Sequence, residues 1–176
     1  MQRNGYESMG EILKKRLRMS KFESPAQEAT LALMVTASEL RANMDRLLAE
    51  FGLTGEQYNI LRILRGAGSE GHPSGEIGCR MIDRSPDVTR RIDTLARQGF
   101  VERERSTGDK RVVRVHITEK GLGLLNSITP KLEVFEQRIV GEINEEDLHR
   151  LAMLCEKMIE RDAIAAEDGN QNCDTD

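Results

Sequence analysis

The sequence predicts a mainly α-helical fold with a small β-hairpin near its centre. Long segments on both sides of the centre repeat apolar residues at intervals of three and four, the period of a helix face. Between them, residues 101–105 and 112–117 have the pattern of two strands, with Val113, Val115 and Ile117 alternating in the second. The composition agrees, because helix formers are abundant and the aromatic residues are two tyrosines and four phenylalanines, with no tryptophan.

The first long helix is predicted to begin at Ser24, because serine is a good N-cap and Pro25 fits the first helical position. One apolar seam runs along this helix until Gly52, and residues 1–24 before it are interpreted as an N-terminal arm or a short helix. The seam consists of Leu33, Ala37, Leu40, Met44, Leu47 and Phe51.

Three helices are predicted between this seam and the hairpin. Thr54 and Gln57 have the spacing of a capping box at the start of the first. A break rich in glycine follows the first helix. Ser74 then opens a short second helix, which is predicted to end at about Met81.

The third of these helices has the clearest start. Ser85 supplies a cap, Pro86 follows it, and Asp87 places an acid in the first turn. Gly99, in a left-handed conformation, and Phe100, folding back, are predicted to end it. The stripe that this helix should bury consists of Val88, Ile92, Leu95 and Ala96.

Two helices are predicted after the hairpin, one capped by Thr118 and one starting at Asn144. Both carry apolar stripes, at residues 122–139 and 148–158, and these fit an intramolecular core as well as a dimer interface. The polar, acidic segment 163–176 is predicted to be a disordered tail.

Several classes of protein are excluded by what the sequence lacks. No apolar run approaches the ~20 residues that cross a bilayer, and the polar N-terminus is unlike a signal peptide, so no membrane partner is expected. The three cysteines and three histidines are scattered, so neither a metal site nor a disulfide framework is predicted, and a reducing cytoplasm is the expected location. No catalytic triad and no phosphate-binding loop occur, so no catalytic residues and no cofactor are expected.

Charge is distributed unevenly along the chain. The formal net charge is −4, yet residues 80–114 hold ten Arg and Lys against six Asp and Glu, a local charge of +4. Residues 160–176 hold six acids and one arginine, a local charge of −5. A basic centre between acidic flanks is compatible with a nucleic-acid interface, although a mixed-charge solvated surface has the same pattern.

The predicted order of helix, short helix, helix, strand, projecting turn and strand is typical of a winged helix-turn-helix. In this fold the helix from Ser85 can enter the major groove, where arginine pairs with guanine and threonine bonds a base or a phosphate. The hairpin tip would reach the DNA backbone or the minor groove, with Asp109 near enough to orient Arg111. The predicted DNA-binding residues are Ser85, Pro86, Asp87, Thr89, Arg90, Arg91, Thr94, Asp109, Lys110, Arg111 and Arg114.

Residues Leu53 to Thr118 resemble the MarR family of winged-helix regulators. The resemblance rests on Leu53-Thr54, on the run from Ser85 to Leu95 and on Gly99-Phe100-Val101. It rests equally on Asp109-Lys110-Arg111 at the hairpin tip, followed by Ile117-Thr118 at the family's spacing. With its flanking helices it covers about residues 25–162, which implies a winged helix-turn-helix at about 53–118 and dimerisation helices at about 25–51 and 119–162.

The resemblance implies a cytoplasmic homodimer that regulates transcription. Repression is the expected effect, and activation is the alternative. Such a dimer would read a pseudo-palindrome of about 15–20 base pairs with half-site centres about one helical turn apart. Many relatives bind small aromatic acids, so the resemblance also implies a small-molecule effector that releases the DNA, but it does not imply which residues bind it. A redox-sensing branch uses a cysteine near the start of the first helix, and this chain has none there; Cys79 and Cys155 are expected to be small buried residues.

Two alternatives belong to other functional classes. A winged helix that binds proteins and has lost DNA binding would carry acids on its recognition face, where this chain has Arg90 and Arg91. An enzyme would need clustered titratable groups beneath a pocket.

Overall fold

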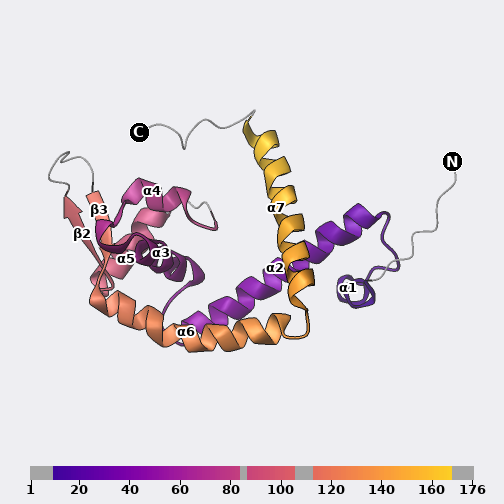
Figure 1. Ribbon diagram of the computed structural model, residues 1–176, viewed down its shortest axis with the longest axis horizontal. Helices are drawn as coiled ribbons and strands as arrows, with labels where there is room; N and C mark the ends of the chain where they lie inside the picture. The colour runs from indigo at the N-terminus through magenta and orange to yellow at the C-terminus, as the bar shows by residue number, and fades with distance from the viewer. Residues whose placement is uncertain (1–9, 84–86, 106–112, 168–176) are drawn as a thin grey trace. The chain divides into compact units, whose positions relative to one another are not determined.

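The computed structural model describes residues 10–83, 87–105 and 113–167, which form two compact units. The first unit ends at Gly55 and the second begins at Glu56. The described elements are mostly helices with a small antiparallel sheet, so the predicted fold class is confirmed (Figure 1). Among the described helices, none has both the length and the apolar character that crossing a bilayer requires.

The first unit contains α1 (Glu11–Leu17) and α2 (Pro25–Ala49). As predicted, Ser24 caps α2: its hydroxyl oxygen accepts from the backbone N–H of Gln27 at 3.1 Å. The Gln27 side chain accepts in return from the N–H of Glu23 at 2.7 Å, so the first turn of α2 satisfies two donors that the helix itself cannot. The seven-residue helix α1 corresponds to the second interpretation of residues 1–24, a short helix.

The second unit contains the rest of the elements. Its helices are α3 (Gly55–Gly66), α4 (Ser74–Cys79), α5 (Val88–Arg97), α6 (Glu119–Val140) and α7 (Glu145–Glu167), with a 3-10 turn η1 (Gly68–Glu70). Its strands are β1 (His72–Pro73), β2 (Val101–Arg105) and β3 (Val113–Ile117).

The sheet has one strand more than the sequence predicted. Its order is β1-β3-β2, all antiparallel, with Val101 opposite Ile117 and His72 opposite Val115. The sequence segment around β1 was predicted to be a break because it is rich in glycine and contains a proline. Proline is tolerated in β1 because this strand lies at the sheet edge, where one side needs no ladder hydrogen bonds.

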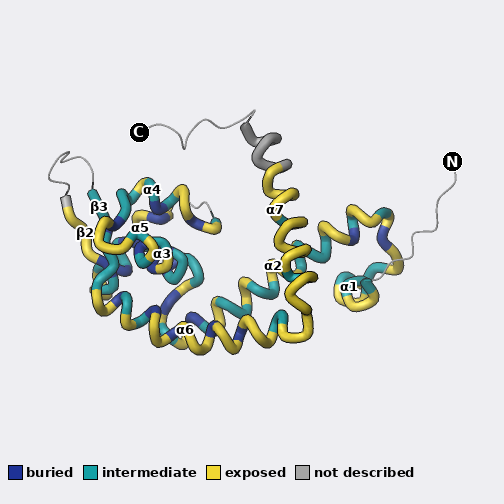
Figure 2. The backbone as a smooth tube through the Cα atoms, viewed as in Figure 1, coloured by how far each residue is buried: buried dark blue, intermediate teal, exposed yellow. Residues whose placement is uncertain are grey.

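The core of the second unit includes buried apolar side chains of α3, α4, α5 and the sheet. As predicted, the α5 residues Val88, Ile92 and Leu95 are buried, the last two completely, while Ala96 at the edge of the stripe is half-buried. Figure 2 shows buried and exposed positions alternating along α5, whereas α3 is mostly buried or half-buried. Other fully buried side chains of the second unit are Ile60, Leu61, Leu64, Ile77, Val115, Leu125 and Ile128.

The end of α5 and the start of α6 are hydrogen-bonded to each other. Gly99 has φ 76°, and the N–H of Phe100 donates to Leu95 O at 3.0 Å, which is the predicted glycine C-cap. Thr118 caps α6 by accepting from Gly121 N at 3.1 Å, and its hydroxyl donates to Gly99 O at 2.8 Å. One threonine therefore caps α6 and joins its start to the end of α5.

The last helix differs from the prediction at its end. Asn144 caps α7 as expected, accepting from Asp147 N at 2.9 Å. However, α7 continues to Glu167, beyond the predicted boundary at residue 162, because the alanine-rich run 163–166 favours helix. Residues 168–176 of the predicted tail lie outside the described residues.

Helix α6 packs closely against the end of the strand before it at one of its glycines but not at another. Substitution of these two glycines by alanine is therefore expected to change the free energy of unfolding in opposite directions. A Cβ at Gly121 would meet the Phe100 carbonyl oxygen and lie 2.7 Å from Ile117 Cγ1, whereas a Cβ at Gly123 meets nothing within 4 Å. We expect Gly121→Ala to lower the free energy of unfolding by about 1–3 kcal/mol, because the close approach is lost. Gly123→Ala should raise it by up to about 1 kcal/mol, because alanine is the better helix former. Urea titrations of both variants measure this, and equal effects would contradict the packing described.

Candidate nucleic-acid interface

Helix α5 is the candidate recognition helix, and it begins later than predicted. Asp87 occupies the N-cap position and its side chain makes no capping hydrogen bond, and the first helical residue is Val88. Ser85 and Pro86, the predicted start and predicted site residues, lie outside the described residues.

The outer face of α5 carries part of the predicted site. Asp87, Thr89 and Arg90 are exposed, and the Arg90 side chain retains 82% of its accessible surface. Arg90 Nε lies 3.8 Å from Asp87 Oδ2, so the two charges are loosely paired across the first turn. Thr94 is half-buried, and its hydroxyl donates to Arg90 O at 3.1 Å.

Arg91 was predicted to face solvent, but most of its side chain is buried. Its side chain is only 20% exposed, and Nη2 donates to Glu56 Oε1 of α3 at 2.9 Å. The physical reason is its place on the helix: it is four residues before buried Leu95, so the two lie on neighbouring parts of one face. Arg91 therefore ties the recognition helix to α3.

A second arginine, which the sequence analysis missed, ties the helix to the wing. Nη1 of Arg103, on β2, lies 2.5 Å from Asp93 Oδ1. Nη2 of the same side chain donates to Thr89 O at 3.4 Å. A guanidinium can make both contacts because its donors point in fixed, divergent directions. The contact is therefore expected to hold the recognition helix and β2 at one relative orientation. In the sequence, the alternating charges of residues 101–105 indicate that Arg103 is a polar residue of a strand. They do not indicate that Asp93 is its partner.

Exposed Arg97, at the C-terminal end of α5, was also missed. Its Nη2 donates to Thr94 Oγ1 at 3.1 Å, so its guanidinium lies along the outer face of the helix. With Arg90 it gives this face two arginines about two turns apart.

The wing is described only at its base. Asp109, Lys110 and Arg111, predicted at its tip, lie outside the described residues. Arg114 of β3, predicted to contact DNA, is half-buried and donates through Nη1 to Glu70 O at 2.9 Å and to Gly71 O at 3.3 Å. Two residues further along, His116 Nδ1 lies 3.2 Å from Ser69 O.

The short helix α4 before the recognition helix has its own charge cluster. Arg80 Nε donates to Glu76 Oε1 at 2.9 Å, and this hydrogen bond holds the pKa of Glu76 below its ordinary value. His72 Nδ1, 3.4 Å from Glu76 Oε2, adds a smaller effect in the same direction. The Glu76 carboxylate therefore offsets part of the local positive charge.

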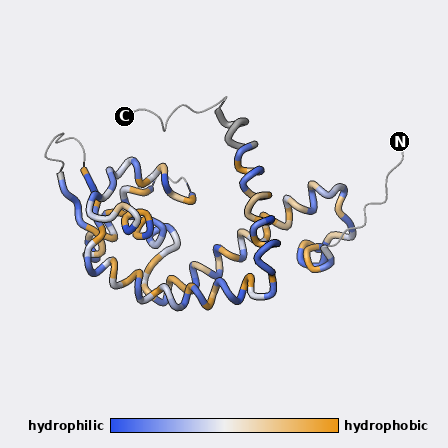
Figure 3. Tube along the Cα trace, viewed as in Figure 1, coloured by the Kyte–Doolittle hydropathy of each residue, from blue (hydrophilic) through white to orange (hydrophobic). Residues whose placement is uncertain are grey.

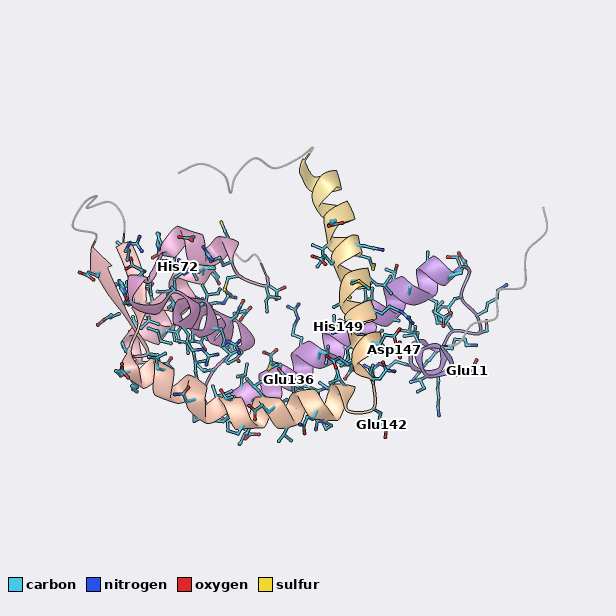
Figure 4. The ribbon with its side chains drawn as sticks, in the orientation of Figure 1. Glu11, His72, Glu136, Glu142, Asp147 and His149 are labelled. Carbon is cyan, nitrogen blue, oxygen red and sulfur yellow. The ribbon has the colours of Figure 1, made fainter. Side chains whose placement is uncertain are left out.

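Metal binding finds no support in the part of the chain that the structure describes, where no group of three or more His, Cys, Asp or Glu side chains could hold an ion. His72 and His149, labelled in Figure 4, lie on separate elements. Cys79 was expected to be buried but is exposed, because the buried residues Ile77 and Met81 lie two positions away on the opposite side of the turn. Cys155 is half-buried.

Comparisons with known proteins agree on the family. Residues 53–113 match the model of the MarR family. The HTH-type transcriptional regulator MhqR of Bacillus subtilis is 27% identical over 144 residues, which are 80% of this chain and 95% of that protein. A MarR transcription factor from Planctomyces limnophilus, known from its crystal structure, is 36% identical with a TM-score of 0.60, and the match covers 77% of this chain and 98% of that one.

The fold is also that of a solved protein–DNA complex. The structure of the S. aureus MepR–DNA complex matches with a TM-score of 0.68 at 22% identity, covering 75% of this chain and 96% of that one. The identity to the Planctomyces protein, over nearly all of that protein's length, shows that this chain belongs to the MarR family of winged helix-turn-helix transcription regulators.

Proposed function

We propose that this regulator binds duplex DNA as a homodimer, with α5 in the major groove and the β2–β3 wing on the adjoining backbone, and acts as a repressor. The observation that carries the proposal is the division of α5 into a buried apolar stripe and an outer face with exposed arginine. MhqR is named a transcriptional regulator and MepR was solved on DNA, which supports DNA binding here and disfavours a purely protein-binding winged helix.

The chemistry of the outer face fits base and phosphate recognition. Arg90 is long enough and free enough to reach a guanine edge, and Thr89 beside it can bond a base or a phosphate. The predicted contacts of Ser85, Pro86, Asp109, Lys110 and Arg111 remain part of the proposal. Phosphate contacts from such residues would fix the register of the helix, while base contacts would supply specificity.

The proposed dimer rests on the apolar surface of α7. Leu151, Leu154 and Met158 follow the spacing of one helix face and are 48%, 53% and 46% exposed, with Ile159 at 68%. Figure 3 shows hydrophobic and hydrophilic segments alternating along α7, and Figure 2 shows most of this helix exposed. Burying such a stripe against a second copy removes apolar area from water, which favours association.

A twofold dimer implies a pseudo-palindromic operator whose half-sites lie about one helical turn apart. Binding there would block transcription, and the proposal therefore includes a regulator that works on the chromosome in the cytoplasm. Family resemblance suggests a small effector that is aromatic and acidic. Such an effector would release the DNA if it bound more tightly to a dimer in which the spacing of the two α5 helices does not match that of the half-sites.

Removing Arg90 is the first test of the proposal. Arg90→Ala should cost about 1–3 kcal/mol of binding free energy on a duplex that the wild type retains, because one bidentate contact is lost. The control is Arg16→Ala: Arg16 lies on α1, outside the winged helix-turn-helix and the α7 stripe, and already pairs with Glu39 of α2. Fluorescence anisotropy measures both, and an undiminished affinity of Arg90→Ala would count against α5 as the recognition helix.

The pair Arg103–Asp93 should act as one unit in DNA binding. Arg103→Ala, Asp93→Ala and the double variant are each expected to weaken binding by a similar factor, because each breaks the same tie between wing and helix. The unfolding free energy should change by no more than about 1 kcal/mol, since both side chains are partly exposed to water. A double-mutant cycle on a bound duplex measures the coupling, and additive losses would contradict this role.

A lysine on the α7 stripe should separate the dimer. Leu154→Lys places a charge among the apolar residues and is expected to give monomers that bind DNA weakly. Met153→Lys is the matched control, because Met153 is equally exposed at 57% but lies away from the stripe on the helix. Analytical ultracentrifugation distinguishes the two, and a Leu154→Lys variant that stays dimeric would contradict the proposed interface.

A further inference from the structure

Three consecutive backbone carbonyls, of Ser69, Glu70 and Gly71, are contacted by side chains of β3. The Arg114 guanidinium donates to the second and third, at 2.9 and 3.3 Å, and His116 Nδ1 lies 3.2 Å from the first. We call this arrangement the carbonyl clasp: the side chains of Arg114 and His116 and the carbonyls of residues 69–71.

The local structure explains why the clasp forms. Arg114 and His116 are two residues apart on β3, so both side chains lie on one face of the sheet while Val115 points into the core on the other. The turn can approach so closely because residue 71 is glycine. Its φ is 59°, and a Cβ there would lie 2.5 Å from Val115 O and 2.6 Å from His116 Nδ1.

The carbonyl partner also fixes the tautomer of His116. A carbonyl oxygen only accepts, so Nδ1 carries the proton. Nε2 is buried with no hydrogen-bond partner in the structure as described, and it lies 3.7 Å from Glu104 Oε2 on β2. Nε2 therefore faces a carboxylate of the neighbouring strand.

Other charges reach His116 from the neighbouring elements. Glu102 of β2 is its cross-strand partner in the sheet register, and Arg114 shares its face of β3. Among these groups, Glu104 is the carboxylate whose oxygen lies 3.7 Å from the His116 ring.

The carbonyl clasp connects the two DNA-reading parts of the fold. The turn 69–71 leads through β1 into α4, the helix that precedes recognition helix α5, while β3 is a strand of the wing. We propose that Arg114 and His116 are positioning residues that fix the wing relative to the helix-turn-helix, and that Arg114 acts through the turn and does not contact a phosphate. This inference rests on the proposed function, because it concerns how DNA is bound.

The dependence of affinity on salt distinguishes a positioning arginine from a phosphate contact. Removing a phosphate contact reduces the slope of log K against log salt by about 1. We expect Arg114→Ala to weaken binding about tenfold at every salt concentration with the slope unchanged, because only the geometry is disturbed. Arg114→Gln, which keeps an amide donor and loses the charge, should leave the slope unchanged as well. A slope reduced by about 1 in either variant would overturn the assignment, and so would unchanged affinity in both.

A pair of variants tests His116 separately. His116→Ala removes the ring nitrogen that lies against Ser69 O, whereas His116→Asn keeps a donor near the Nδ1 position. We expect His116→Ala to weaken binding at every salt concentration with the slope unchanged, and His116→Asn to retain more of the wild-type affinity, because only the geometry of the turn is disturbed. Equal losses of affinity in the two variants would contradict the role of His116.

These outcomes separate the two proposals. If wild-type protein binds no duplex at low salt, the proposed function fails. If wild type binds while the results for the Arg114 and His116 variants go against the carbonyl clasp, only this inference fails. Thermal melting of each variant by circular dichroism identifies any that does not fold.

Discussion

The burial of one face of α5 is the constraint on which the rest of the structure depends. Val88, Ile92 and Leu95 lie against the core, and each contributes about 1.5–3 kcal/mol by leaving water. Because a helix repeats every 3.6 residues, this burial fixes which side chains face outward, and Arg90 is opposite the stripe. Rotating the helix to present another face would expose the stripe, so the outer surface is determined by the packing of the inner one.

Polar contacts then restrict the motions that burial alone would allow. Arg91 ties α5 to α3 through Glu56, Arg103 ties it to β2 through Asp93, and the Thr118 hydroxyl joins its end to the start of α6. The Arg103–Asp93 pair contributes little to stability, since partly exposed ion pairs are screened by water. The consequence of the three contacts is geometric, because a helix that reads base edges must keep one register against the wing that contacts the backbone.

The sequence was sufficient to predict whatever depends on local chemistry. Ser24, Thr118 and Asn144 cap the helices they were expected to cap, Gly99 ends α5, and the period of the apolar stripe identified the buried face of that helix. The sequence could not predict contacts between residues that are distant in the chain. Arg91 meets Glu56 across 35 residues and Arg114 meets Glu70 across 44, and no local pattern indicates either pairing. The edge strand β1 was missed for the same reason, since only its pairing with β3 makes His72 and Pro73 a strand.

The most direct test of the account is a comparison of the duplexes that wild type and Arg90→Ala select from a random pool. The account predicts a twofold-symmetric consensus for wild type, with half-site centres about one helical turn apart. For Arg90→Ala it predicts the same consensus relaxed at one position in each half-site, because α5 is the element that reads bases. An asymmetric wild-type consensus, or identical consensus sequences for the two proteins, would contradict the claim that the exposed face of α5 reads the operator.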